Sequence, residues 1–253
     1  MEKFITSREN KIIKQVISLN KKSNRLKLSL FLAEGKRICE EALLWARDDI
    51  SYFLLSHSFY KKNPELTSGF DTYIVPDDLF AKICDTETPQ GILCCIKIKN
   101  SNETVGFSPN VLILDGVSEP GNMGTILRTA EAMGFNDIFL VKGSADIYNP
   151  KVIRSTMGAV FRLDFHFEDS YEFINKLKEN GYKIISTALK NSISLEETPV
   201  FEKNAIVIGN EGNGISENIL NVSDILTKID MAGNAESLNA AIAAGIVMYK
   251  FSK

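Results

Sequence analysis

Apolar and polar blocks alternate along the first hundred residues, and their spacing predicts strands and helices in turn. Residues 11–28 carry apolar side chains at helical intervals among many lysines, which indicates basic helical structure. FLAEGKRICEEALLWA then has the pattern of a strand that turns into a helix, with Ile38, Ala42 and Trp45 on one face. The remaining expected elements are strands at 52–55, 72–75 and 92–98, a polar turn at 61–69 and a short helix from Asp77.

This alternation favours a small α/β domain over residues 1–99, followed by a polar linker at 100–109. Residues 110–253 repeat the alternation. Strands are expected at 111–114, 138–141, 183–186, 205–208 and 226–229. Helices are expected at 123–133, 151–160, 171–180 and 237–250. The second half is therefore predicted to be a mainly parallel sheet with helices on both faces, which binds ligands at the carboxyl ends of its strands.

The stretch VLILDGVSEPGNMGTILRTAEAMGF, residues 111–135, carries the first candidate chemistry. An apolar strand is followed by a loop with proline and two glycines and then by an amphipathic helix. Ile126 and Ala130 belong to the apolar face, and Arg128 lies about 160° from Ala130 by the roughly 100° per residue of a helix. Because Asn122 precedes Arg128 in this loop, we expect an amide, an approachable backbone and a guanidinium on one rim.

Two later strands end in loops of the same kind. AIVIGNEGNGIS, residues 205–216, places Glu211 among three glycines, where backbone groups can approach a nucleotide-like ligand closely. IDMAGNAESLNAAIAAGIVMYK, residues 229–250, is a strand, a polar loop and a helix of small apolar residues. Ser237 is placed to cap this helix, and Asn239 is expected two residues into it.

Each of these residues also has an ordinary structural interpretation. Asn122 fits a turn residue, Arg128 a surface ion pair, and Glu211 a solvated carboxylate. The three loops are, however, all expected at the carboxyl ends of strands of one sheet, which favours a common ligand site.

Composition and charge bound the function further. The chain is 44% hydrophobic, shows no signal-peptide pattern, and has no apolar stretch long enough for a bilayer, so we expect a cytoplasmic protein. Four cysteines without C-x-x-C spacing and two isolated histidines predict no metal site. Net charge is −3, but residues 1–37 hold ten lysines or arginines against three glutamates. This basic segment fits either RNA binding or a solvated amphipathic helix.

With these three motifs, the sequence resembles the SpoU/TrmH family of RNA ribose 2′-O-methyltransferases, in the SPOUT superfamily. The resemblance is carried by PGNMGTILRTAEAMGF, IVIGNEGNGIS and IDMAGNAESLNAAIAAG, in this order, and covers residues 111–251. FLAEGKRICEEAL and TPQGILCCI resemble, more loosely, the ribosomal-protein-like RNA-substrate-binding domain that often precedes the catalytic domain. Two positions depart from the family pattern: Glu119 replaces an aspartate, and Ala232 replaces a proline.

The resemblance implies an α/β domain with a deep trefoil knot, a feature that is rare among proteins, and S-adenosylmethionine as cofactor. It also implies a homodimer formed through the C-terminal domain. By matching position, the implied catalytic residues are Asn122, Arg128, Glu211, Ser237 and Asn239. The implied cofactor-binding residues are Thr187, Ala188, Leu189, Gly209, Asn210, Gly212, Gly214, Ile229 and Leu238. The candidate RNA contacts are Lys22, Arg25, Lys36, Arg37, Gln90, Arg154 and Ser155.

The implied reaction is attack of a ribose 2′-hydroxyl of RNA, expected to be ribosomal RNA, on the sulfonium methyl of S-adenosylmethionine. The family proposal makes Arg128 the general base, but a guanidinium keeps its proton at neutral pH. We therefore favour the hypothesis that Arg128 binds the adjacent phosphate and stabilises the developing alkoxide. The alternatives are methylation of transfer RNA, a non-catalytic RNA-binding protein that retains the fold, and a dinucleotide-dependent oxidoreductase. The sequence does not contain the G-x-G-x-x-G pattern that a dinucleotide-dependent oxidoreductase would be expected to have.

Overall fold

The computed structural model describes residues 2–99 and 106–252, which fall into two compact units. Unit 1 comprises Met1–Asn100 and Asp146–Phe161, and unit 2 comprises Ser101–Ala145 and Arg162–Lys253. The sequence-based boundaries do not separate out the segment 146–161, which belongs to unit 1 although it lies within the second half of the chain. Residues 100–105 of the predicted linker lie outside the described residues.

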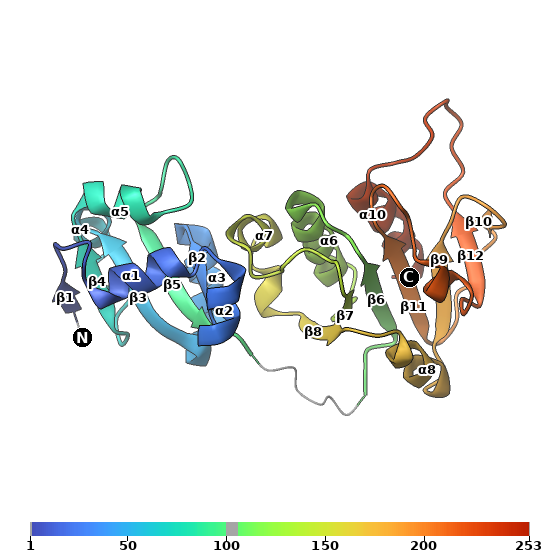
Figure 1. The fold of residues 1–253 in the computed structure, drawn as a ribbon, viewed down its shortest axis with the longest axis horizontal. Coiled ribbons are helices and arrows are strands. Elements are labelled where there is room, and N and C mark those ends of the chain that lie inside the picture. Colours follow the sequence, from blue (N-terminus) through green and yellow to red (C-terminus); the bar gives the residue numbers. More distant parts are fainter. Residues whose placement is uncertain (1, 100–105, 253) are drawn as a thin grey trace. The chain divides into compact units, whose positions relative to one another are not determined.

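Unit 1 contains a mixed five-stranded sheet in the order β1-β4-β3-β5-β2. Its strands are β1 (Glu2–Phe4), β2 (Leu30–Glu34), β3 (Ile50–Ser56), β4 (Thr72–Val75) and β5 (Ile92–Lys97) (Figure 1). Its α-helices are α1 (Lys11–Ser18), α2 (Lys22–Leu28), α3 (Lys36–Trp45), α4 (His57–Lys62), α5 (Asp77–Ile83) and α7 (Pro150–Thr156). Two 3-10 helices complete it, η1 (Arg47–Asp49) and η2 (Ala159–Phe161). The expected helical stretch 11–28 is thus two helices, and α4 begins before the expected polar turn and overlaps its first residues.

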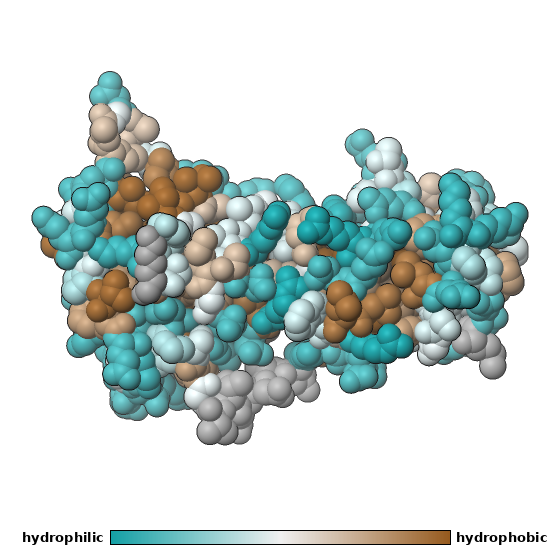
Figure 2. All heavy atoms as spheres, turned by 180° about the vertical axis from the view of Figure 1, so that it is seen from behind, coloured by the Kyte–Doolittle hydropathy of each residue, from teal (hydrophilic) through white to brown (hydrophobic). Residues whose placement is uncertain are grey.

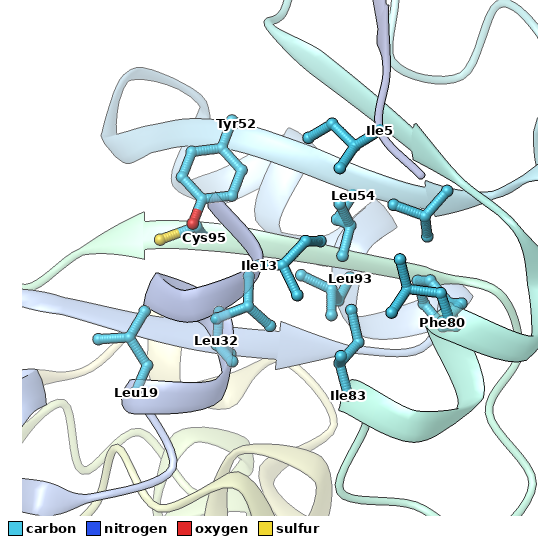
Figure 3. Packing of buried hydrophobic residues seen from close by; sticks show 13 residues of the cluster. Ile5, Ile13, Leu19, Leu32, Tyr52, Leu54, Phe80, Ile83, Leu93 and Cys95 are labelled. Carbon is cyan, nitrogen blue, oxygen red and sulfur yellow. The ribbon is translucent and has the colours of Figure 1, made fainter. Parts of the chain in front are cut away.

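One hydrophobic core of unit 1 lies between its sheet and the helices α1 and α5. Figure 3 shows Ile13 of α1 beside the strand residues Leu54 and Leu93, with Phe80 of α5 at one end of the cluster and Leu19, after α1, at the other. All five side chains are at most 1% exposed. The amphipathic pattern of the basic N-terminal segment therefore serves to bury its apolar face against this sheet.

The three residues expected on one face of α3 differ in burial. Ile38 and Ala42 are buried, whereas Trp45, at the last position of the helix, is 55% exposed. The helix ends at Trp45, so its buried face stops one turn earlier.

The segment 146–161 packs on β2 through polar and aromatic contacts within unit 1. The Arg25 guanidinium, in α2, pairs with the Asp146 carboxylate and also donates to the Leu19 carbonyl. Phe31 of β2 packs against Tyr148, with ring centroids 4.8 Å apart. These contacts explain why this segment belongs to the first unit.

Unit 2 contains a seven-stranded sheet in the order β10-β12-β9-β11-β6-β7-β8, and every pairing in it is parallel. Its strands are β6 (Asn110–Asp115), β7 (Asp137–Val141), β8 (Asp164–Glu168), β9 (Lys183–Thr187), β10 (Ile193–Ser194), β11 (Asn204–Gly209) and β12 (Ile225–Lys228). Its helices are α6 (Pro120–Ala132), α8 (Glu172–Glu179), α9 (Glu217–Leu220) and α10 (Ala240–Phe251) (Figure 1). The sequence analysis missed the short elements β8, β10 and α9.

Helices cover the buried strands of this sheet. Phe173 and Leu177 of α8 share a core with Val111 and Val207 of the central strands, whereas α10 packs against α6 and β11. The predicted α/β class with a helix-covered parallel sheet is confirmed. The trefoil knot stays a prediction.

Candidate functional site

A pocket of about 820 Å³ lies at the carboxyl ends of β9, β11 and β12 in unit 2. The loops that follow these strands form much of its wall, and α10 contributes Ala243 and Val247. All nine residues proposed to bind the cofactor line this pocket: Thr187, Ala188, Leu189, Gly209, Asn210, Gly212, Gly214, Ile229 and Leu238. The location follows the general rule for open parallel sheets.

Glycines allow the loop after β11 to fold back on itself. Asn210 and Gly214 exchange two backbone hydrogen bonds, of 2.9 and 3.0 Å. A Cβ atom at Gly209 would lie 2.4 Å from the carbonyl carbon of Gly214, so no other residue fits there without moving the backbone. Gly214 adopts φ 71°, a left-handed conformation that favours glycine. The two glycines thus set the shape of this pocket wall.

Glu211, at the tip of the same loop, accepts hydrogen bonds from the segment between β6 and α6. Its Oε2 accepts from the Ser118 backbone N–H and hydroxyl, both at 3.1 Å. Its Oε1 accepts from the Glu119 backbone N–H at 3.1 Å and from the Asn122 side-chain amide at 2.9 Å. The carboxylate therefore joins the glycine-rich loop to the start of α6.

These donors determine the ionisation of Glu211. Partial burial acts to raise the pKa of the carboxyl group, but the Asn122 amide and the N–H groups of Ser118 and Glu119 outweigh it. Together they lower the pKa to about 2. At neutral pH Glu211 is an ionised hydrogen-bond acceptor and does not serve as a proton donor.

Asn122 lies in the first turn of α6, not in the loop expected from its proline and glycines. The helix begins at Pro120, a position where proline is favoured because the first N–H groups of a helix have no partner within it. Since Glu211 can only accept, the NH2 group of Asn122 faces Glu211 and its Oδ1 faces away. That Oδ1 accepts from Asn239 Nδ2 at 2.9 Å, so the orientation of the amide is fixed from both sides.

Asn239 is the N-cap of α10, which corrects the expectation that Ser237 caps this helix and that Asn239 lies within it. Its Oδ1 accepts from the backbone N–H groups of Ala241 and Ile242, at 2.9 and 3.3 Å. The helix begins at Ala240, three residues later than expected. Ser237 instead lines the pocket. Asparagine competes well for the N-cap, and here its second polar atom remains available for Asn122.

Arg128 is separated from this network along α6. Six residues after Asn122, it lies roughly 9 Å along the helix axis, from the rise of 1.5 Å per residue. Its side chain is exposed, and within residues 2–99 and 106–252 it makes no hydrogen bond or ion pair. Hydrogen bonds thus join Asn122 directly to Glu211 and Asn239, whereas no hydrogen bond or ion pair among the described residues links Arg128 to them.

The candidate RNA contacts all belong to unit 1 and differ in accessibility. Lys22, Lys36, Arg37 and Gln90 are exposed, and the Gln90 side chain accepts from the Lys36 backbone N–H at 2.8 Å. Arg154 and Ser155, on α7, are half-buried. The expectation that Arg25 contacts RNA is corrected. Its side chain is 3% exposed, and its guanidinium pairs with Asp146 and donates to the Leu19 carbonyl.

Sequence reasoning missed the segment that holds Glu211. Ser118 and Glu119 contribute mainly through backbone N–H groups, which every residue type except proline supplies. Only their place directly before the first motif, between a predicted strand and a helix, could have pointed to them.

Comparison with known proteins decides the family. The sequence model described as the SpoU rRNA Methylase family matches residues 109–249. The chain belongs to this family. A second model, described as the MRM3-like substrate binding domain, matches residues 10–94. Both parts of the sequence-based resemblance are confirmed.

Full-length relatives extend the match to the whole chain. The 23S rRNA (guanosine(2553)-2′-O)-methyltransferase RlmP of Bacillus subtilis is 34% identical over 98% of this chain and 98% of its own. A solved structure titled AdoMet bound rRNA methyltransferase from Sinorhizobium meliloti is 28% identical, with a TM-score of 0.86 over 98% of this chain and 97% of its own. A putative RNA methyltransferase of the TrmH family from Porphyromonas gingivalis is 29% identical, with a TM-score of 0.83 over 94% and 95% of the two chains.

Proposed function

We propose that this SpoU-family enzyme transfers a methyl group from S-adenosylmethionine to a ribose 2′-hydroxyl of 23S ribosomal RNA. The observation that carries the proposal is the pocket at the carboxyl ends of β9, β11 and β12. One of its walls is joined through Glu211 to the Asn122 and Asn239 amides. Family membership supplies the reaction class, and the full-length relative from Bacillus subtilis points to 23S ribosomal RNA.

The pocket residues fit this cofactor. Its volume of about 820 Å³ lies within the range of roughly 300–1,000 Å³ for sites of small ligands and cofactors. Apolar side chains such as Leu189 and Leu238 provide surface for an adenine ring, and the backbone of the glycine-rich loop offers hydrogen-bonding groups without a Cβ in the way. S-adenosylmethionine, when bound, supplies an activated methyl group on a sulfonium.

The hydrogen-bonded residues Asn122, Glu211 and Asn239 orient the reacting groups, and they do not remove the proton of the ribose 2′-hydroxyl. Both asparagine amides are neutral donors and acceptors, and Glu211 has too low a pKa to take a proton near neutral pH. We assign Asn122 to orienting the nucleotide, with Glu211 and Asn239 holding its amide in one orientation. Arg128 binds the phosphate next to the target ribose and stabilises negative charge that develops on the 2′-oxygen. With S-adenosylmethionine bound, the methyl group would pass from sulfur to the ribose 2′-oxygen, the hydroxyl proton would go to solvent, and S-adenosylhomocysteine would be the second product.

Unit 1 is proposed to bind the RNA. Its first 37 residues hold ten lysines or arginines, and the exposed cations Lys22, Lys36 and Arg37 can contact phosphates. Gln90, Arg154 and Ser155 complete the proposed contact set. The full-length relative that modifies 23S ribosomal RNA is bacterial, and bacterial ribosomes are assembled in the cytoplasm, so we propose that this enzyme acts there. Among the described residues, no helix has the length and apolar character needed to cross a membrane.

Methyl transfer to purified RNA tests this function. The protein is incubated with tritiated S-adenosylmethionine and 23S ribosomal RNA from a strain that lacks it, and labelled ribose is mapped by its resistance to alkali. We expect one labelled guanosine in 23S ribosomal RNA and no label in transfer RNA. Label confined to transfer RNA would overturn the proposed substrate, and no label in any RNA would favour a non-catalytic protein.

A homodimer through α10 is also proposed. Ile242, Ile246 and Tyr249 recur at helical spacing and are 55%, 40% and 54% exposed. The opposite side of α10 is buried against α6 and β11, so the helix is apolar all round, which is typical of a helix that is covered on every side. Figure 2 shows hydrophobic surface beside the loop that projects from unit 2. A second copy of this chain is the proposed cover.

Substitution Ile246→Asp tests the dimer. A charge in a buried interface would be desolvated without a partner, so we expect the sedimentation coefficient to fall to that of a monomer. The exposed-face control Lys176→Ala on α8 should remain dimeric. A wild-type protein that sediments as a monomer at micromolar concentration would refute the dimer.

A further inference from the structure

Residues 115–119, which comprise the last residue of β6 and the turn before α6, are held from two sides. On one side it holds Glu211, through Ser118 and Glu119, and the Gly116 carbonyl accepts from Asn210 Nδ2 at 2.8 Å. This side faces the glycine-rich loop of the pocket. The position of Glu211, and through it that of the Asn122 amide, therefore depends on where the segment 115–119 lies.

On the other side, the same segment is held by the chain that leaves β7. The Ser144 hydroxyl donates to the Leu114 carbonyl at 3.0 Å and accepts from the Gly116 backbone N–H at 3.2 Å. The Ala145 N–H donates to the Val117 carbonyl at 2.8 Å. Gly116 has φ 75°, so its N–H is directed by an unusual backbone conformation and finds its acceptor in a side chain. Ser144 is the only side chain in these contacts from the β7 side.

The chain then continues directly into unit 1. Asp146 follows Ala145, is the first residue of the segment 146–161, and pairs with the buried Arg25. Two residues later, Tyr148 packs on Phe31. The backbone that holds the segment 115–119 is thus covalently continuous with the core of the proposed RNA-binding unit.

We propose that Ser144 is a positioning residue for methyl transfer. Its hydroxyl fixes the segment 115–119 so that Ser118 and Glu119 hold Glu211, and Glu211 in turn orients the Asn122 amide. Ser144 itself does not line the described pocket and reaches it only through Asn210 and Glu211, so we expect its main effect on the transfer step. This inference rests on the proposed function, because it assigns Ser144 a part in the same reaction.

Two substitutions remove this contact to different degrees. Ser144→Ala deletes the hydroxyl and leaves the Gly116 N–H without its acceptor. Ser144→Cys keeps a side chain of similar shape but replaces the hydroxyl with a weak donor and acceptor. The control is Ser223→Ala, which also removes a half-buried hydroxyl of unit 2 with two hydrogen bonds, to Ser186 and the Ile219 carbonyl, but does not touch the segment 115–119.

The measurements are kcat and KM for unmodified 23S ribosomal RNA, and the Kd of S-adenosylmethionine by calorimetry. We expect kcat to fall about tenfold in Ser144→Ala and about threefold in Ser144→Cys, with the Kd and KM within twofold of wild type. Ser223→Ala should keep all three values within twofold. The inference is overturned if kcat is unchanged in both Ser144 variants, or if Ser223→Ala loses as much. Absence of S-adenosylmethionine binding by the wild-type protein would instead refute the proposed function.

Discussion

Asn122 and Arg128 lie on the same helix, α6, yet their side chains are held in opposite ways. Both polar atoms of the Asn122 side chain are engaged, one by Glu211 and the other by Asn239. Arg128 is exposed and, in the described part of the chain, has no polar partner. One part of the candidate site is therefore organised before any ligand binds, and the other is left to be engaged by a ligand.

The difference follows from what each residue is proposed to do. A neutral amide that orients a nucleotide gains from being fixed in advance, because the cost of ordering it is met during folding. A guanidinium would bind an RNA phosphate less tightly if it were already paired with a carboxylate of the same chain. The comparison therefore predicts different consequences for substitutions in the two parts.

The largest expected effect is at Arg128. Substitution Arg128→Ala should lower kcat about 10³-fold, at the upper end of the effect of removing one donor to developing negative charge. Thermal stability should not change, because this exposed guanidinium has no polar partner among residues 2–99 and 106–252. Single-turnover methyl transfer and melting temperature are the measurements. Lys176→Ala, which removes an exposed cation from α8, is the matched control, and an equal loss of activity there would contradict the assignment.

A smaller effect is expected at Asn239, where two substitutions separate its two contacts. Asn239→Asp keeps an oxygen to cap α10 but has no N–H for Asn122, so we expect about a 10²-fold lower kcat with little change in stability. Asn239→Ala removes both contacts and should cost about 1 kcal/mol of unfolding free energy in addition. Urea denaturation and kcat for both variants check this. Equal stability of the Asp and Ala variants would show that the cap contributes nothing.

Of these three residues, the smallest effect is expected at Glu211. In Glu211→Gln the remaining oxygen can still accept from Asn122 and Glu119, and the Ser118 hydroxyl can rotate to accept from the new NH2 group. The Ser118 backbone N–H loses its acceptor, and Asn210 Nδ2 loses its longest contact, at 3.5 Å, so we expect kcat to fall about tenfold. A loss as large as that of Arg128→Ala would mean that the negative charge of Glu211 itself takes part in the reaction.

The pH dependence of stability should differ between the wild-type protein and the Glu211→Gln variant. The folded-state pKa of Glu211, about 2, lies below the ordinary value of 4.5. Its ionised form therefore stabilises the fold above about pH 4.5, and this contribution is lost as pH falls towards 2. Because the side chain is largely exposed, solvent screening limits the contribution to about 1 kcal/mol. The melting temperatures of wild type and Glu211→Gln should differ at pH 6 and converge near pH 2, and a constant difference would contradict this account.

Much of unit 2 was predictable from the sequence, because buried parallel strands and amphipathic helices leave clear patterns. The expected strands at 111–114 and 205–208 lie within β6 and β11, and the glycine-rich loop between 209 and 214 lines a pocket, whose role in binding the cofactor stays a prediction. The family and the α/β class are confirmed. The assignment of catalytic roles stays a prediction, since it depends on chemistry that geometry alone does not test.

Helix starts were less predictable, because capping is a local competition between neighbouring polar residues. Ser237 and Asn239 are both good N-cap residues, and the sequence offers no rule that chooses between them. The structure selects Asn239, which satisfies two backbone N–H groups and still reaches Asn122. At α6 the glycines suggested a loop, but Pro120 at the first position of the helix outweighed them.

Long-range contacts were beyond sequence reasoning altogether. Arg25 sits in a basic stretch and was expected to contact RNA, but its partner, Asp146, is 121 residues away in the chain. Nothing in the pattern of residues 146–161 indicates that they pack with the N-terminal unit. Periodicity reports which face of an element is buried, but it does not identify the element that covers that face.

The segment 146–161 also decides how this protein can be recombined with its relatives. A chimera that exchanges only residues 2–99 would bring in a foreign α2 and β2 to meet the native Asp146 and Tyr148, which pair with Arg25 and Phe31. The transferable module is discontinuous, and a graft intended to redirect the enzyme to another RNA has to carry both pieces together.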